Sequence, residues 1–249
     1  MNLSNFFGPD IFTQPILVPL VSYLIQNTVA TVLILVLIGL VVLQEPIIHL
    51  FLKKGNTEDQ DFEFRYFWQT LMLIPLVSVP FIWAMYQFGV FEIYTGFESV
   101  GLMALQLFVM IVLHDAYFYW CHRLLHTKFF WDIHGIHHRD TDPTVVSSHI
   151  FHHIETAINY TFLVWFTLLA GLLVGGVFFL PALVFVLFTI TWNVYGHGKK
   201  NIFPDNVTKS WLGQWIVWPS YHLEHHRQGT GNFEFFFTYW DKLMKTKVE

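Results

Sequence analysis

Histidine is the residue type in this chain that most clearly indicates chemistry, because many of the histidines are clustered. The stretch YHLEHH, residues 221–226, contains three histidines, and HGIHH, residues 134–138, repeats the same H-x-x-H-H spacing. HRLLH, residues 122–126, adds two histidines four positions apart. Neutral imidazole is a common ligand of transition-metal ions. These clusters therefore predict a metal centre.

Helical geometry suggests how the rings of each cluster are directed. Positions i, i+3 and i+4 of an α-helix share one face, so each H-x-x-H-H group is expected to aim its three rings at one point. Asn193 and His197, in NVYGH, form a further pair four residues apart. The candidate metal ligands are His122, His126, His134, His137, His138, Asn193, His197, His222, His225 and His226.

The number of candidate ligands indicates how many ions they would hold. A tetrahedral zinc ion takes about four ligands and an octahedral ion about six. Nine histidines and one asparagine exceed the needs of any single ion. They suit two ions with about five ligands each, which leaves each ion an open position for oxygen or water. The sequence thus predicts a dimetal site.

Carboxylates close to the clusters are few, and we expect them to support the imidazoles rather than bind metal. The glutamates and Glu-x-x-His pairs of soluble di-iron bundles are missing from this sequence. A carboxylate can accept the spare ring N–H of a ligating histidine and fix its orientation. Asp115 lies seven residues before His122, on almost the same helical face. Glu224 lies between ligands of the third cluster but points to another face, so a surface position is its alternative.

Composition indicates an all-α integral-membrane protein. Hydrophobic residues make up 54% of the 249 residues and charged residues only 12%, about half the usual charged fraction. The chain is expected to form one domain, residues 1–249, with N-terminal membrane helices in 1–98 and a catalytic region in 99–249. Spans are predicted at 28–50, 67–88, 99–121, 156–174 and 177–195, after an interfacial piece at 15–26. Four spans with other boundaries are the main alternative.

The distribution of lysine and arginine predicts the orientation. All thirteen fall at 53–54, 65, 123–139 and 199–247, and 1–52, 89–97 and 171–176 contain none. The positive-inside bias then places the N-terminus outside, and the C-terminus and every histidine cluster on the cytoplasmic side. A bacterial inner membrane and an endoplasmic reticulum both fit. No cleavable signal peptide is expected, because the N-terminus lacks a basic region.

Other classes of protein fit the sequence poorly. The single cysteine, Cys121, excludes an internal disulfide and a cysteine-based metal finger. A net charge of −5 without a basic tract makes nucleic acid an unsuitable partner. The oligomeric state cannot be inferred.

Three stretches resemble the fatty acid hydroxylase/sterol desaturase superfamily. They are HDAYFYWCHRLLH (114–126), HGIHHRDTDPTVVSSHIFHHIE (134–155) and PSYHLEHHRQGTGNFEFFFTYWDKLMKT (219–246). Members of this superfamily are integral-membrane enzymes with a histidine-rich di-iron centre. The resemblance extends over roughly 105–246. Lys245 stands where many members have glycine, which suggests a change at the surface.

The resemblance implies roles for particular residues. The nine histidines above match the family's ligand positions, and Asn193 is similar to an asparagine that reaches its metal through water in acyl-CoA desaturases; helix–helix hydrogen bonding is its alternative. FHHIE resembles the family's FHPLE, which implies that His152 and Glu155 brace the second cluster or line the site. His114, His149 and His153 receive no definite role.

The resemblance also implies an O2-dependent lipid monooxygenase, with hydroxylation favoured over desaturation. The expected cofactors are two iron ions, although a purified sample could contain zinc. The expected partners are a lipid substrate, membrane lipids and an external electron donor, namely a cytochrome b5, a ferredoxin or a reductase. Two alternatives stay open: a zinc-dependent membrane hydrolase of a lipid amide or ester, and a haem- or metal-binding carrier without catalytic activity.

Overall fold

Four long helices dominate this computed structural model, which describes residues 57–96, 99–144 and 146–248. They are α3 (Thr57–Gln87), α4 (Val100–Leu125), α6 (His153–Val174) and α7 (Phe179–Gly196). Each contains an apolar stretch of 18 to 26 residues with few charges. With a rise of 1.5 Å per residue, even the shortest extends about 27 Å, close to the thickness of the hydrocarbon core. All four are therefore long and apolar enough to cross a membrane.

The expected all-α class is confirmed, and four of the five predicted spans coincide with these helices. The boundaries differ by up to five residues, since the apolar stretches are 62–87, 100–125, 153–174 and 179–196. The largest change near the histidines is at the end of α4, which continues past residue 121 to Leu125 and so includes His122. The predicted span at 28–50 and the piece at 15–26 lie outside the described residues.

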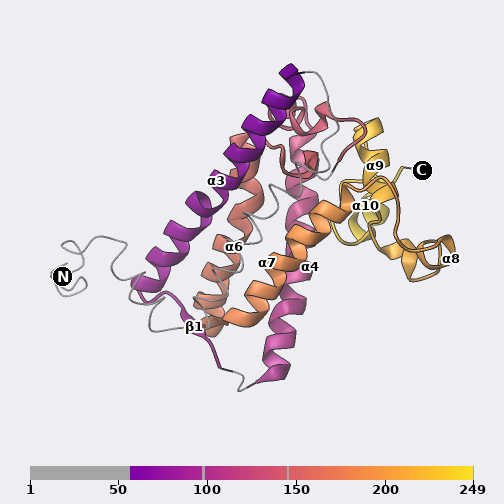
Figure 1. The fold of residues 1–249 in the computed structure, drawn as a ribbon. Coiled ribbons are helices and arrows are strands. Elements are labelled where there is room, and N and C mark those ends of the chain that lie inside the picture. Colours follow the sequence, from indigo (N-terminus) through magenta and orange to yellow (C-terminus); the bar gives the residue numbers. More distant parts are fainter. Residues whose placement is uncertain (1–56, 97–98, 145, 249) are drawn as a thin grey trace. The chain divides into compact units, whose positions relative to one another are not determined.

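The helices pack side by side within the unit Lys54–Glu249. α3 packs along α6, and α4 packs against both α6 and α7 (Figure 1). Their shared interior is rich in aromatic rings, among them Phe162, Phe185 and Phe236. Large apolar side chains also point outward, such as Leu173 at 79% exposure and Leu76 at 64%. Apolar side chains on both faces are typical of helices surrounded by lipid.

A short parallel sheet joins two of the connections at one end of the helices, away from α9 (Figure 1). β1 (Glu92–Tyr94) pairs with β2 (Gly176–Phe178), with Glu92 opposite Gly176. A Cβ atom on Gly176 would lie 2.4 Å from the Glu92 carbonyl oxygen, so this close pairing requires glycine. Gly175, with a φ of +82°, ends α6 in the left-handed conformation. Only the short strand β2 therefore separates the end of α6 from the start of α7.

Short elements at the other end of the bundle carry most of the remaining polar residues. Between α4 and α6 lie α5 (Trp131–His134), η2 (His137–Arg139) and η3 (Ser147–His149). After α7 come α8 (Asp205–Thr208), η4 (Gly213–Trp215), α9 (Pro219–Gln228) and α10 (Tyr239–Met244). Pro219 occupies the first turn of α9, where its missing N–H costs no hydrogen bond.

Lys245 is exposed, in agreement with a change at the surface, and its backbone conformation is unusual. It ends α10 with a φ of 57°, in the left-handed region. Glycine adopts that conformation without a steric penalty, whereas a side chain with a Cβ atom is strained there. The glycine of many family members at this place is therefore explained by the backbone.

Candidate metal centre

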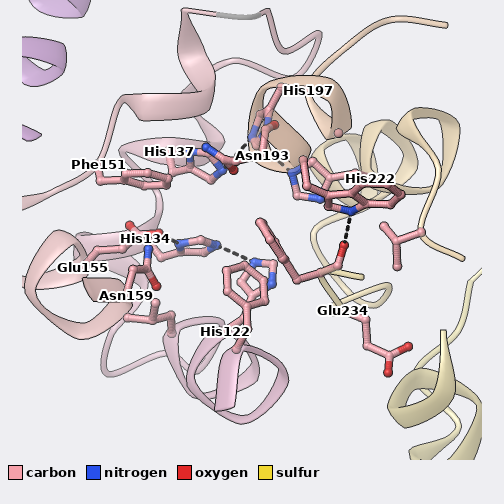
Figure 2. A pocket seen from close by; sticks show the side chains of 16 residues that line it. His122, His134, His137, Phe151, Glu155, Asn159, Asn193, His197, His222 and Glu234 are labelled. Carbon is pink, nitrogen blue, oxygen red and sulfur yellow. Dashed lines mark hydrogen bonds and ion pairs between the residues drawn. The ribbon is translucent and has the colours of Figure 1, made fainter. Parts of the chain in front are cut away.

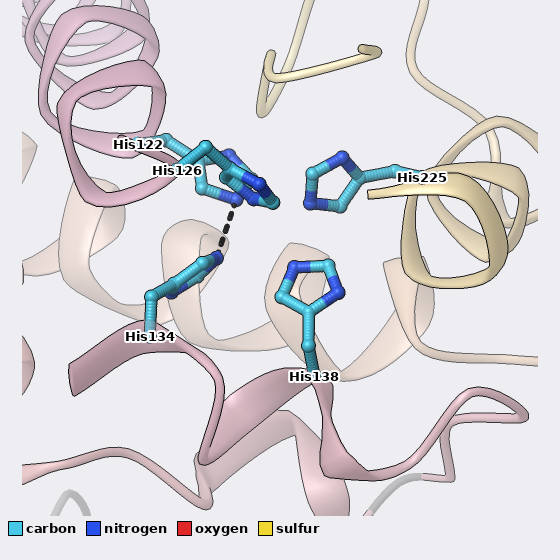
Figure 3. A group of neighbouring side chains, drawn as sticks. All are labelled: His122, His126, His134, His138 and His225. Atoms are coloured by element: carbon cyan, nitrogen blue, oxygen red, sulfur yellow. Dashed lines mark hydrogen bonds between the residues drawn. The ribbon is translucent and has the colours of Figure 1, made fainter. Parts of the chain in front are cut away.

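The structure gathers all nine candidate histidines into two neighbouring groups. The first, which we call the five-histidine group, consists of His122, His126, His134, His138 and His225 (Figure 3). The second, the four-histidine group, consists of His137, His197, His222 and His226. Within each group, one nitrogen atom from every ring lies within 4.8 Å of the corresponding atoms of the others. Rings from five different elements therefore meet in two small volumes.

Each H-x-x-H-H cluster is divided between the two groups, so the expectation that its rings aim at one point is wrong. On α9, His225 belongs to the five-histidine group, and His222 and His226 belong to the other. Successive residues of a helix are rotated by about 100°, and this rotation separates His225 from His226. In the second cluster, His134 ends α5 and His137 begins η2, so no single helix presents its three rings.

Backbone carbonyl oxygens orient several of the imidazoles. Nδ1 of His122 lies 2.7 Å from the Phe233 oxygen, and Nδ1 of His225 lies 2.6 Å from the Gly231 oxygen. A carbonyl oxygen can only accept a hydrogen bond, so each Nδ1 must carry the proton. The neutral ring then has its lone pair on Nε2, the atom that faces the group.

Two rings of the four-histidine group are held in the same way. His197 donates from Nδ1 to the Asn193 carbonyl oxygen at 2.7 Å, and His226 donates from Nδ1 to the Asp140 carbonyl oxygen at 3.1 Å. Their Nε2 atoms approach Nε2 of His222 at 3.2 and 3.1 Å. Such carbonyl contacts are the usual support of histidines that bind metal.

The spacing of the Nε2 atoms fits metal coordination. The separation is 3.0 Å between His122 and His134 and 3.3 Å between His137 and His197. Two nitrogens bound to one ion at about 2.1 Å, with an angle of about 90–109°, would lie roughly 3.0–3.4 Å apart. Inward-facing lone pairs at this distance repel one another, and a shared cation removes that repulsion.

Unpartnered nitrogen atoms in both groups fit metal ions as well. Among the described residues, no hydrogen-bond partner exists for Nε2 of His138, Nε2 of His225, either ring nitrogen of His126, or Nδ1 of His137. These atoms are buried, and a buried polar atom without a partner is costly. Bound metal ions would satisfy inward-facing nitrogens, so the residues present suit such ions.

Burial also keeps the imidazoles neutral, the form that binds metal. Desolvation lowers the pKa of His138 and His197 to about 3, and that of His126 to about 4. It lowers the pKa of His222 and His225 well below the usual value, with neighbouring imidazoles acting in the same direction. Near pH 7 these rings are unprotonated and can offer their lone pairs.

The three carboxylates singled out from the sequence have different surroundings. Oε1 of Glu155, on α6, lies 2.8 Å from Nδ1 of His134, and both side chains are buried. Asp115 instead accepts backbone N–H bonds from Phe236 at 2.8 Å and Phe237 at 3.3 Å. Glu224 accepts a hydrogen bond from Gln228 on the outer side of α9. Glu155 alone of these three is placed against a ring of either group.

Asn193 lies beside the four-histidine group. Its side-chain Nδ2 atom donates to the Ser148 carbonyl oxygen at 2.6 Å, and its backbone carbonyl oxygen accepts from His197. The side chain lines the cavity next to both groups. The side-chain amide therefore connects α7 to the segment before α6. The side-chain Oδ1 is the oxygen that remains for a ligand.

The other described histidines, His114, His149, His152 and His153, lie outside both groups. Nδ1 of His152 accepts the Ile154 N–H at 3.2 Å and caps α6, and the ring of His153 packs on it. Nδ1 of His149 lies 2.8 Å from the Ser148 hydroxyl. His114 is buried in the helix bundle among phenylalanine rings.

The loop Gly231–Glu234 supplies two of the carbonyls that orient imidazoles. The sequence did not reveal that α10 holds this loop in place. Asp241 on α10 accepts the backbone N–H groups of Phe233 and Glu234, each at 3.1 Å. It also accepts the hydroxyls of Tyr221 at 3.0 Å and Thr246 at 2.7 Å. We call these four hydrogen bonds of the Asp241 carboxylate the C-terminal clasp. Phe233, Glu234 and Asp241 all lie in the stretch GNFEFFFTYWDK, residues 231–242, but no spacing rule connects them to His122 or His225.

Two cavities meet at the metal centre. The first is lined by rings of both groups, with Glu155, Asn159 and Asn193 (Figure 2). The second lies between α4, α6 and α7 and is mostly apolar. Five residues line both: Phe118, Phe151, Asn159, Asn193 and Phe235. The apolar space within the helix bundle therefore borders the space beside the imidazoles.

Comparison with known proteins points to one family. A sequence model of the fatty acid hydroxylase family matches residues 107–246, more than half of the chain. A C-4 methylsterol oxidase of Schizosaccharomyces pombe is 27% identical over 190 residues, covering 72% of this chain and 61% of the yeast protein. A methylsterol monooxygenase of Aspergillus fumigatus is 28% identical over 178 residues, covering 69% of this chain and 58% of the fungal protein.

A relative named for a different activity is also similar. A very-long-chain aldehyde decarbonylase of Oryza sativa subsp. indica is 26% identical over 160 residues, covering 60% of this chain but only 24% of the plant protein. The chain spans less than two thirds of the length of each of these relatives. No solved structure matches the chain.

Proposed function

Because the chain belongs to the fatty acid hydroxylase family, we propose that it is a membrane-bound, O2-dependent oxidoreductase that hydroxylates a lipid at a centre of two iron ions. The observation that carries this proposal is the meeting of nine buried histidines in two adjacent groups. The five-histidine group would hold one ion and the four-histidine group the other. When bound, the irons would supply the redox chemistry for oxidising an unactivated C–H bond.

The chain's own residues bind and orient the ions and keep water away. The Phe233 and Gly231 carbonyls fix two rings of the five-histidine group, and Glu155 fixes His134. The four-histidine group has one ring fewer, and Asn193 offers its oxygen there, directly or through water. Burial of the rings excludes bulk solvent, which protects a reactive centre from side reactions.

The shape and polarity of the two adjoining cavities support a lipid substrate. Phenylalanine and aliphatic side chains dominate the second cavity, and none of the described residues that line it is an Asp, Glu, Lys or Arg. A sterol-like or long-chain acyl compound would place its apolar body there and one carbon beside the imidazoles. The names of the methylsterol and aldehyde relatives agree with a hydrophobic substrate that is oxidised. We favour hydroxylation over desaturation.

An external electron donor is part of the proposal. Hydroxylation transfers one oxygen atom of O2 to the substrate and releases the other as water, which requires two electrons and two protons in each turnover. The sequence contains no haem-attachment, flavin or nicotinamide motif. A cytochrome b5, a ferredoxin or a reductase would deliver the electrons at the cytoplasmic surface.

Metal analysis with matched variants tests this function. Protein purified without oxygen should contain about two iron ions per chain, and His225→Ala should lower both iron content and turnover. His153→Ala is the control, because this exposed ring belongs to neither group. Full iron and full turnover in His225→Ala would contradict the proposal. Activity that persists without oxygen and reductant would instead identify a zinc-type hydrolase.

A further inference from the structure

His114 is a buried imidazole that is not part of the metal centre. It lies on α4 and is 6% exposed. It precedes His122 by eight residues, which corresponds to about 12 Å along the helix axis. The ring is therefore too far along α4 to belong to either histidine group, and it is a member of neither.

The surroundings of His114 are almost wholly aromatic hydrocarbon. Rings of five phenylalanines lie around it, with centroid distances from 4.9 Å (Phe162) to 6.1 Å (Phe118). Among the described residues, Nδ1 has no hydrogen-bond partner. A buried polar atom of this kind is costly unless something else occupies the site.

His114 also forms part of the wall of the second cavity. Of the other polar side chains of that wall, Thr189 donates to the Phe185 carbonyl at 2.8 Å and Asn193 donates to the Ser148 carbonyl at 2.6 Å. Asn159 and Tyr160 also line it. The cavity borders the space beside the imidazoles through shared residues such as Phe118 and Asn159. His114 thus offers a hydrogen-bonding group in the apolar part of these adjoining cavities.

We infer that His114 binds a neutral oxygen atom, a hydroxyl or a carbonyl, on the lipid that occupies this cavity. The inference rests on the proposed function, because it assumes that the same lipid reaches the metal centre. The substrate would then be an elongated lipid. Its oxygen atom would lie about 12 Å from the carbon to be oxidised, which is the distance along α4 between His114 and His122. An earlier reaction that introduces or retains that oxygen must supply the substrate.

The chemistry of the wall selects among possible occupants. A carboxylate would be an unpaired charge in this cavity, since no lysine or arginine is among the lining residues that the structure describes, and an unpaired buried charge is unfavourable. An ordered water needs about two to four polar partners, and the phenylalanine rings packed on His114 offer none. The further polar residues of the wall are Asn159, Tyr160, Thr189 and Asn193. A single oxygen attached to an apolar body matches one nitrogen within a hydrocarbon wall.

Matched ligands test the inference. The iron-loaded protein in detergent micelles would be titrated with 1-dodecanol and with dodecane, and the apparent Kd obtained from the shift in Tm. One hydrogen bond should make the alcohol bind about two- to tenfold more tightly than the alkane. His114→Phe should abolish that preference, and Thr189→Val, in the same wall, should retain it.

The possible results are distinguishable. Equal binding of alcohol and alkane to the unaltered protein, or the same preference in His114→Phe, overturns the inference. If His114→Phe does not fold, His114→Gln replaces it and should keep part of the preference, because its amide can form the bond. Iron content measured on the same samples tests the metal centre separately, so either proposal can fail without the other.

Discussion

At the residue scale, the contact between Glu155 and His134 shows how one carboxylate can control a metal ligand. The carboxylate oxygen lies 2.8 Å from Nδ1, and both groups are buried. An ionised carboxylate fixes the proton on Nδ1, directs Nε2 toward the group and raises its basicity as a ligand. Without this partner the ring can rotate or exchange its proton, and the ion it binds should dissociate faster.

We therefore predict that Glu155→Leu accelerates iron loss to a chelator by about 10–100-fold. Glu155→Gln should have a smaller effect, because its amide oxygen can still accept from Nδ1. The rate of iron release from purified protein measures both. Glu224→Gln is the control, since Glu224 bonds to Gln228 on the outer side of α9. Equal release rates for all four proteins would remove the assigned role of Glu155.

Residue identity was largely predictable from the sequence, whereas the pairing of residues was not. Nine imidazoles at helical spacing are enough to indicate two metal sites. Their distribution depends on where helices end: η2 separates His137 from His134, and the rotation along α9 separates His225 from His226. The orienting carbonyls of Gly231 and Phe233 leave no trace in the sequence, because every residue has a carbonyl group.

At the element scale, the C-terminal clasp connects α10 to one histidine group. Asp241 accepts four hydrogen bonds and fixes the loop whose carbonyls orient His122 and His225. The four-histidine group relies on other supports, since His197 bonds to its own helix and His226 to Asp140. Loosening the clasp should therefore affect the two groups unequally.

Asp241→Asn is expected to lower iron content from about two ions to about one per chain. An amide nitrogen in place of one carboxylate oxygen cannot accept, so at least one hydrogen bond to a charged acceptor, worth about 1.5–3 kcal/mol, is lost. Iron analysis and Tm measure the two effects. Asp142→Asn, which breaks an exposed ion pair with Lys199, is the control. Loss of both ions together, or of neither, would show that the clasp does not act selectively.

The long helices were the most predictable elements, because long apolar stretches with few charges admit few other structures in a membrane. Their ends were less predictable. Polar residues close the apolar run of α4 near 121, yet the helix continues to Leu125 because buried contacts replace lipid around His122. The short pairing of β1 with β2 was not expected, since segments of three residues, distant in sequence, carry no periodic signal.

At the scale of the whole molecule, charge and chemistry coincide at one end of the bundle. The histidine groups lie at the C-terminal end of α4, where Arg123 and Lys128 also lie. The opposite end of α4 adjoins β1 and the neighbouring Thr95, in a segment without lysine or arginine. The positive-inside bias then predicts a cytoplasmic metal centre, which an electron donor from the cytoplasm could reach.

Cysteine labelling can test this orientation. Cys121 is the only cysteine, so Cys121→Ser provides a background for Thr95→Cys and Lys128→Cys. Both positions are exposed, and the 26 residues of α4 between them extend about 39 Å. In intact bacterial cells, a membrane-impermeant maleimide should label position 95, and position 128 only after permeabilisation. Unaltered iron content would confirm that each variant is folded. Labelling of position 128 in intact cells would place the metal centre outside and exclude a cytoplasmic electron donor.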